Sequence, residues 1–210
     1  LSYLAEEKKI DKESLKSYTP SICNRLDRNT TGIVIAAKTL AAARILNMII
    51  NDRSIKKEYL CIVSGKAKEE AIISAWLRKD EKSNTVVVDK DEFKAAKPIK
   101  TAYKRLYTDG TYSLLSVELI TGRTHQIRAH LASVGLPIIG DVKYGDKDAN
   151  ASVKKKYGIK NQLLQAYRLT FPKLEGDFSY LSGKIFESSI DKKFMEVLKE
   201  YTWQHGSPED

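Results

Sequence analysis

The sequence predicts an α+β fold, with a mixed, mostly antiparallel sheet and flanking helices. Short runs rich in β-branched and aromatic residues outnumber the segments with helical spacing, and residues that suit hairpin turns separate several of these runs. Strands and helices do not alternate along the chain as they would in a doubly wound parallel sheet. The 210 residues are 42% hydrophobic and 30% charged, so one globular domain spanning residues 1–210 is expected.

Strands are expected where apolar and β-branched residues cluster over short stretches. The expected strands cover residues 33–37, 57–64, 72–77, 85–88, 101–107, 112–119 and 163–171. Asp109 and Gly110 stand between two of them and are typical of a hairpin turn. These segments therefore predict a sheet built largely from hairpins.

Helices are expected where apolar residues recur every three to four positions. Such spacing occurs over about residues 40–50, at Ile127, Leu131 and Val134 before Gly135, and over residues 194–201. Residues 1–16 resemble the end of a charged helix, residues 154–156 a solvated lysine-rich surface segment, and residues 206–210 a disordered tail.

The composition limits the classes of function. The net charge is +9, from 36 Lys and Arg against 27 Asp and Glu, which attracts polyanions but fits a protein that is basic for solubility equally well. No apolar run approaches the ~20 residues that span a bilayer, and the N-terminus lacks the order of a signal peptide. Two cysteines, Cys23 and Cys61, are too few for a disulfide framework, so a reducing, cytoplasmic location is expected.

Sites for metals and organic cofactors are not expected. The chain has no glycine-rich phosphate loop. Residues 146–150 begin like a calcium loop, but Ala151 replaces the required glycine and Tyr157 the bidentate glutamate. The histidines, His125, His130 and His205, do not form a metal-binding pattern.

Two segments carry residues suited to chemistry. The first is Asn-Arg-Leu-Asp-Arg-Asn-Thr-Thr-Gly, residues 24–32, in which Arg25 and Arg28 flank Asp27. Nearby cations favour the ionised form of a carboxyl group and keep it available as a nucleophile. An ordinary ion-pair cluster explains the same residues and remains an alternative.

The second segment is Thr-Gly-Arg-Thr-His-Gln-Ile-Arg, residues 121–128, at a junction between a strand and a helix. Arg123, His125, Gln126 and Arg128 place many hydrogen-bond donors within six residues, which suits contacts to phosphate and sugar. The alternative is a solvated helix start that Thr121 or Thr124 caps.

Together, four motifs in a fixed order resemble the RluA-like family of RNA pseudouridine synthases. They read RLDR.TTG, KKEYL..V.G, TGRTHQIRAHLA..G.PI.GD..YG and LLQAYRLTFP, and they extend from about residue 24 to residue 172. The resemblance implies an isomerase that converts uridine to pseudouridine in ribosomal or transfer RNA without a metal or cofactor. It also implies a fold with a central RNA-binding cleft.

The resemblance assigns roles to four residues. Asp27 corresponds to the catalytic aspartate, and Arg123 to the arginine that pairs with it. Tyr59 corresponds to the tyrosine that packs on the target base, and Leu164 lies near the apolar wall of the pocket. The remaining residues expected to bind the substrate are Arg25, Arg28, His125 and Arg128.

Some positions depart from the family pattern. Asn24 and Gln165 stand where the family usually has histidines, so altered support of the site is expected rather than lost activity. The family's opening strand and the small RNA-binding domain of many members are absent from this chain, which is expected to affect RNA affinity and target choice. A non-catalytic RNA-binding module and a basic structural protein of the ribosome are the alternatives, and a monomer is expected.

Overall fold

The structure is a computed structural model that describes residues 18–200. Its strands are β1 (Ser21–Ile22), β2 (Thr31–Gly32), β3 (Ala36–Ala37), β4 (Lys56–Ser64), β5 (Glu70–Asp80), β6 (Thr85–Asp89), β7 (Lys97–Thr108), β8 (Tyr112–Leu119), β9 (Leu164–Thr170) and β10 (Ile185–Glu187). Its helices are α3 (Leu40–Asn51), α4 (Gln126–Ser133), α5 (Lys147–Tyr157), α6 (Lys192–Glu200) and a 3-10 turn at Gly176–Leu181.

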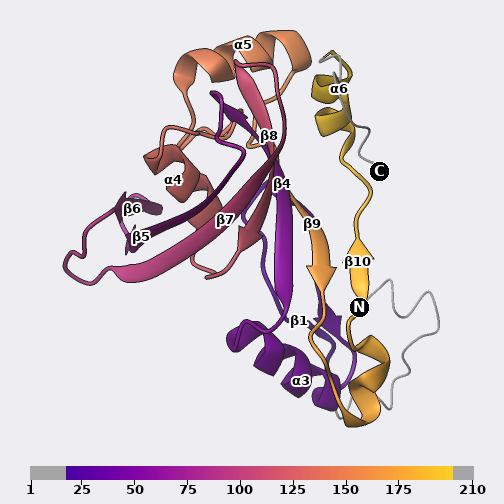
Figure 1. Cartoon of the computed structure of the whole chain (residues 1–210). Coiled ribbons are helices and arrows are strands. Elements are labelled where there is room, and N and C mark those ends of the chain that lie inside the picture. The colour runs from indigo at the N-terminus through magenta and orange to yellow at the C-terminus, as the bar shows by residue number, and fades with distance from the viewer. Residues whose placement is uncertain (1–17, 201–210) are drawn as a thin grey trace.

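Most strands join one sheet in the order β10-β9-β4-β8-β7-β5-β6, with β2 added beside β9 (Figure 1). Every pair in that order is antiparallel, whereas β2 runs parallel to β9. The prediction of an α+β fold with a mixed, mostly antiparallel sheet is confirmed. Among residues 18–200, no helix is both long and apolar enough to cross a bilayer.

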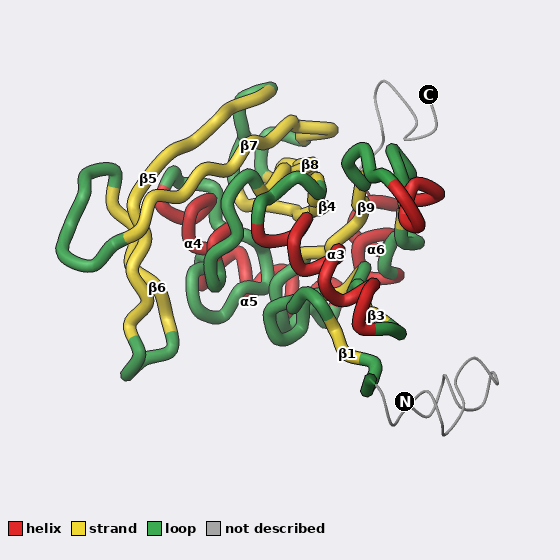
Figure 2. The backbone as a smooth tube through the Cα atoms, turned by 90° about the horizontal axis from the view of Figure 1, so that it is seen from below, coloured by secondary structure: helices red, strands yellow, loops and turns green. Residues whose placement is uncertain are grey.

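The two faces of the sheet bury different side chains, because alternate residues of a strand point to opposite sides. Tyr59 and Cys61 of β4 pack in the same core cluster as Ile127 and Leu131 of α4. The intervening residues of β4 pack with α5 and α6 in a second cluster, through residues such as Phe194. Figure 2 shows α4 and α3 as separate helices, with α4 nearer to β5 and β7 and α3 nearer to β4. Helix α4 therefore determines what lies on the Tyr59 side of the sheet.

Several predicted elements are confirmed with small shifts in their ends. The helix expected over about residues 40–50 is α3, and Asp109 accepts hydrogen bonds from the backbone N–H groups of Thr111 and Tyr112 in the expected hairpin turn. The helices and tail expected at residues 1–16 and 206–210 lie outside the described residues.

The strand expected over residues 33–37 is wrong in its extent. The structure has β2 before it and β3 at its end, and the residues between them are not in a strand. The Asn24 side chain accepts the hydrogen bond of the Ile35 N–H at 2.7 Å, and Cys23 N–H donates to the Ile35 carbonyl at 2.8 Å. These contacts with the preceding loop replace a regular ladder.

The lysine-rich segment at residues 154–156 is part of helix α5, which the sequence did not predict. Asp146 caps the start of this helix by accepting from Ala149 N–H at 2.7 Å, and Gly158, at φ 65°, ends it. Val153 is the one buried residue of α5. A helix that buries so little has no apolar periodicity to recognise.

Candidate active site

A pocket of about 530 Å³ opens on the side of the sheet that α4 covers. Seven of the eight predicted site residues line it: Arg25, Asp27, Arg28, Tyr59, Arg123, His125 and Leu164. The eighth, Arg128, lies behind this lining and donates a hydrogen bond to Asp27. Residues that the sequence places more than 130 positions apart therefore meet at one site.

A tight turn presents Asp27 to the pocket. The Thr30 N–H donates to the Asp27 carbonyl at 3.0 Å, and Asn29 adopts a left-handed conformation with φ 68°, which asparagine tolerates better than most residues. The Gln162 side chain donates to the Arg28 carbonyl at 2.7 Å. The segment before β9 thus holds the turn from outside.

The chain leaves this turn through Gly32, which lies directly against β9. An added Cβ at Gly32 would collide with the Ala166 carbonyl, and the residue has φ 110°. The next residue, Ile33, donates its N–H to the same carbonyl at 3.0 Å. Only glycine permits this approach and this backbone angle, so Gly32 fixes the distance between the Asp27 loop and the sheet.

The loop of residues 121–125 forms another wall of the pocket. Its order depends on Gln126, whose side chain is buried. The Gln126 Oε1 accepts from Thr121 Oγ1 at 2.9 Å and from Arg123 N–H at 3.1 Å, while Nε2 donates to Lys100 O and Thr101 Oγ1. His125, at φ 54°, is left-handed and turns the chain into α4.

Asp27 pairs with Arg128, not with the expected Arg123. The Arg128 Nη1 lies 3.2 Å from Asp27 Oδ2. Among the described residues, no other cation lies within 4.0 Å of the Asp27 carboxylate. The other two nitrogens of Arg128 bind both oxygens of Asp141, at 2.7 and 2.9 Å. Asp141 therefore holds the guanidinium in a bidentate grip that leaves one nitrogen for Asp27.

This network is largely shielded from water. The side chain of Arg128 is 5% exposed and that of Asp141 is fully buried, whereas that of Asp27 is 24% exposed. Burial alone would raise the pKa of Asp141, but the hydrogen bonds and charge of Arg128 lower it. Burial opposes the charge of Arg128, yet its two carboxylate partners raise its pKa overall. Arg128 and Asp141 are therefore both ionised. Asp27 lines the pocket and is held there by the fixed guanidinium of Arg128.

The aromatic and imidazole groups of the pocket are neutral near pH 7. Burial, and then the charge of Asp27, raises the pKa of Tyr59 to about 12, so its hydroxyl keeps its proton. Burial lowers the pKa of His125. Its Nδ1 lies 2.9 Å from the Tyr144 hydroxyl, which in turn accepts from Val86 N–H at 2.8 Å. His125 is therefore oriented by residues that the sequence pattern did not single out.

Two further cations line the pocket. Arg123 has a buried Nε without a hydrogen-bond partner among the described residues. Lys57 lies beside Gly122, with Nζ 3.9 Å from where a Cβ of Gly122 would be, and burial followed by the charge of Arg53 lowers the pKa of Lys57. Lys57 was not predicted, although it stands two residues before Tyr59 and so points to the same side of β4.

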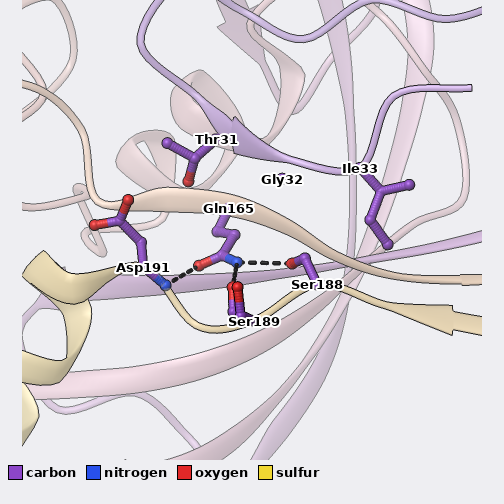
Figure 3. A pocket seen from close by; sticks show the side chains of 7 residues that line it. All are labelled: Thr31, Gly32, Ile33, Gln165, Ser188, Ser189 and Asp191. Atoms are coloured by element: carbon purple, nitrogen blue, oxygen red, sulfur yellow. Dashed lines mark hydrogen bonds between the residues drawn. The ribbon is translucent and has the colours of Figure 1, made fainter. Parts of the chain in front are cut away.

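The two departures from the family pattern occupy structural positions. Asn24 holds the Ile35 N–H, as described above. Gln165 is 1% exposed and faces a separate pocket of about 300 Å³ (Figure 3). Its amide donates to Ser188 Oγ and to the Ser189 carbonyl, both at 2.7 Å, and accepts from Asp191 N–H at 2.9 Å. Gln165 joins β9 to the segment before α6 and points away from its neighbour Leu164.

Sequence reasoning missed Asp141 and Tyr144 as parts of the site. Both follow a short turn that the motif GD..YG marks, so the signal was present, but nothing in the sequence linked them to Asp27. Among the described residues, no three His, Cys, Asp or Glu side chains gather as a metal site would require.

Comparisons with known proteins agree on one family. Residues 2–133 match the family described as RNA pseudouridylate synthase. The chain is 38% identical over 173 residues to an uncharacterized RNA pseudouridine synthase of Mycoplasma genitalium, covering 80% of this chain and 51% of that protein. It is 35% identical over 184 residues to ribosomal large subunit pseudouridine synthase D of Borreliella burgdorferi, covering 87% and 52%.

A third relative is tRNA pseudouridine synthase C of Salmonella typhi, 31% identical over 204 residues, covering 89% of this chain and 74% of that protein. The chain spans about half the length of the Mycoplasma and Borreliella relatives. The structure of human RNA pseudouridylate synthase domain containing 4 superposes with a TM-score of 0.69 at 22% identity, covering 88% of this chain and 76% of that one, which supports the fold. The chain belongs to the RNA pseudouridylate synthase family, and the resemblance to its RluA-like members is confirmed.

Proposed function

We propose that this protein isomerises uridine to pseudouridine in RNA, with Asp27 as the nucleophile and the target base lifted out of its stack. The observation that supports this most is the ion pair of Asp27 and Arg128, because Asp27 and Tyr59 both line a pocket of about 530 Å³. Its volume lies in the range of pockets that bind small ligands. The cations Arg25, Arg28, Lys57 and Arg123 surround a single carboxylate lining group, which suits an anionic substrate.

The reaction breaks the bond from the base nitrogen to the ribose, turns the base and joins it again through a ring carbon. The carbon loses its proton and the released nitrogen ends protonated, so no electrons are gained or lost. Asp27 can attack the ribose carbon, remove a neighbouring proton or add to the base ring. In each route Asp27 must be held in place, and Arg128 does this because Asp141 fixes the orientation of its guanidinium.

Tyr59 and Leu164 are proposed to hold the extruded base. Unstacking a nucleotide costs a few kcal/mol, and stacking on an aromatic ring returns ~1–3 kcal/mol. Tyr59 is 8% exposed and Leu164 is 4% exposed, so both are rigid walls rather than mobile surface groups. The protonated Tyr59 hydroxyl is a hydrogen-bond donor when the base detaches.

The substrate is proposed to be ribosomal or transfer RNA, since the names of two relatives state these substrates. A monomer, a cytoplasmic location and one domain over residues 1–210 remain predictions.

The test is the isosteric variant Asp27→Asn. We expect pseudouridine formation in ribosomal and transfer RNA to fall at least about a thousand-fold, as it does when a nucleophile is removed. RNA affinity should persist, because the change removes a negative charge from a basic pocket. Circular dichroism should be unchanged, since Arg128 keeps Asp141 as a partner.

The matched control is Asp148→Asn, an exposed aspartate in the first turn of α5, which should retain full turnover. Full turnover of Asp27→Asn would reject Asp27 as the nucleophile. A wild-type chain that binds RNA but forms no pseudouridine would favour the non-catalytic RNA-binding module.

A further inference from the structure

A second groove adjoins the Asp27 pocket at the end of β5. It encloses about 540 Å³, and its cationic lining residues are Arg78, Lys79, Lys97 and Arg123. Lys97 is the direct partner of Leu77, the residue before Arg78, in the ladder of β5 and β7, and all three residues line the hollow. We call this the β5 groove. Gly122, Arg123 and Thr124 line both hollows, so the β5 groove and the Asp27 pocket share a wall.

The β5 groove carries an excess of positive charge. Glu81 is its one carboxylate lining residue, and it is already paired with Lys79 at 2.6 Å. Within residues 18–200, no carboxylate lies within 4.0 Å of the charged groups of Arg78, Lys97 or Arg123. The nearby Asp80 accepts from Ser83 Oγ and Lys82 N–H instead.

Neutral contacts hold one of these cations in place, and another has a side-chain nitrogen without a partner among the described residues. Arg78 Nη1 donates to the Lys94 carbonyl at 3.2 Å, and its guanidinium lies 5.4 Å from the centre of the Phe93 ring. Arg123 donates its backbone N–H to Gln126, but its side-chain Nε is buried with no acceptor. A buried charged donor without a partner is costly, so an anion at the shared wall would relieve this cost.

No aromatic side chain is among the lining residues of the β5 groove. Grooves that hold single-stranded nucleic acid through its bases provide rings for stacking. This groove offers separated cations instead, which suits contacts with backbone phosphates, and such contacts do not read sequence.

We propose that the β5 groove binds the backbone phosphates of the single-stranded RNA on one side of the target uridine. The inference rests on the proposed function, which places that uridine in the adjoining pocket. The strand leaves the pocket past Arg123 and continues over Lys97 and Arg78. The groove then contributes affinity that depends on RNA length and salt but not on sequence.

The test replaces two cations with polar residues of similar length, in Arg78→Gln combined with Lys97→Gln. The matched control is Lys154→Gln combined with Lys155→Gln. These exposed lysines lie on α5, whose Val153 packs in the cluster on the other face of the sheet. Both pairs remove the same net charge, so a general attraction between a basic protein and RNA is weakened equally in the two.

Binding is measured by fluorescence anisotropy between 0.1 M and 1 M salt, with RNAs that carry one uridine and extend by zero or six nucleotides on either side. Each phosphate contact to a single strand adds about 0.7 to the slope of log affinity against log salt. Losing two contacts should lower this slope by about 1.4, so affinity at 0.1 M relative to 1 M falls about 25-fold. We expect this loss in the β5 groove pair, for RNA extended on one side, beyond the smaller and length-independent change that the α5 pair shows.

Equal losses in the two pairs, or a loss that does not depend on RNA length, would overturn the proposal. Should Arg78→Gln disturb folding, Lys97→Gln alone, compared with Lys154→Gln, should lower the slope by about 0.7, or about 5-fold. An unchanged slope in that single variant would also overturn it.

The outcome is separable from the proposed function, because binding is measured without turnover. If the wild-type protein forms no pseudouridine, but only the β5 groove pair loses length-dependent RNA binding, the groove proposal stands and the proposed function fails. If the wild-type protein forms pseudouridine, but both double variants bind long RNA equally well, the proposed function stands and the groove proposal fails.

Discussion

Replacing Arg128, which lies behind the pocket lining, should destabilise the protein more than replacing any residue of the lining itself. Its guanidinium is the shared partner of Asp27 and Asp141, and its side chain is 5% exposed. Arg128→Met keeps most of the side-chain length and the contact with the Tyr144 ring, which lies 5.2 Å from the guanidinium carbon. The substitution therefore removes the charge and the hydrogen bonds with little change in volume.

The magnitude follows from what is left behind. Asp141, with a fully buried side chain, would keep the backbone N–H groups of Lys143 and Tyr144, at 2.8 and 3.1 Å, but lose its counter-charge. Removing one partner of a buried ion pair costs about 3–5 kcal/mol. Asp27 is more exposed and can be solvated, so it adds little. The loss is a large share of a typical unfolding free energy of about 5–15 kcal/mol.

Urea denaturation of Arg128→Met, Asp141→Asn and the double variant measures this cost. A neutral amide at residue 141 removes the stranded charge, so the double variant should recover part of the stability lost in Arg128→Met, with a coupling of about 1–3 kcal/mol. A loss below about 1 kcal/mol in Arg128→Met, or no recovery in the double variant, would refute the reasoning.

The same variants should differ in their response to pH. The pKa of Asp141 is lowered in the folded protein by Arg128, so the stability that this pair contributes is present above the ordinary aspartate value of about 3.9. It is lost as pH falls through the lowered folded value. The difference in stability between wild type and Arg128→Met should therefore shrink as pH falls from neutral towards 3.

Two further predictions concern groups away from the ion pair. Burial lowers the pKa of His130 from 6.5 to about 4, so the free energy of unfolding should rise with pH between these values, by up to about 3 kcal/mol. Urea denaturation of His130→Gln at pH 4.5, 5.5 and 7 should show a smaller rise than the wild type. An identical rise in the two proteins would contradict the argument. Gly32→Ala should lower stability by about 2 kcal/mol or more, because of its left-handed backbone and the collision with Ala166. The control is Gly110→Ala, because Gly110 also has a left-handed backbone, at φ 91°, but no neighbour within 4 Å of an added Cβ. Thermal melting should show a smaller loss of stability for Gly110→Ala than for Gly32→Ala. Equal losses would show that the close approach of Gly32 to β9 is unimportant.

The sequence predicted those parts of the fold whose burial follows a regular pattern. Residues of β4 alternate between two core clusters, and Leu46 and Ile49 of α3 face one side, so strand and helix were both recognisable. Helix α5 buries Val153 alone and depends on its caps. The segment at residues 33–37 is apolar, but side-chain and loop hydrogen bonds determine its path, and propensity does not report such contacts.

The site was predictable as a set of residues but not as a set of contacts. Arg123 and Arg128 are five positions apart, and His125 between them is left-handed, so the two side chains leave the backbone in different directions. Which of them meets Asp27 is decided by Asp141, thirteen residues beyond Arg128, because its two oxygens fix the direction of that guanidinium. Arg123 is then left with a buried nitrogen and no carboxylate, at the wall between the Asp27 pocket and the β5 groove. If Arg128 serves the nucleophile and Arg123 serves the RNA, Arg123→Met should weaken RNA binding and lower its salt slope by about 0.7, while the unfolding free energy changes far less than in Arg128→Met.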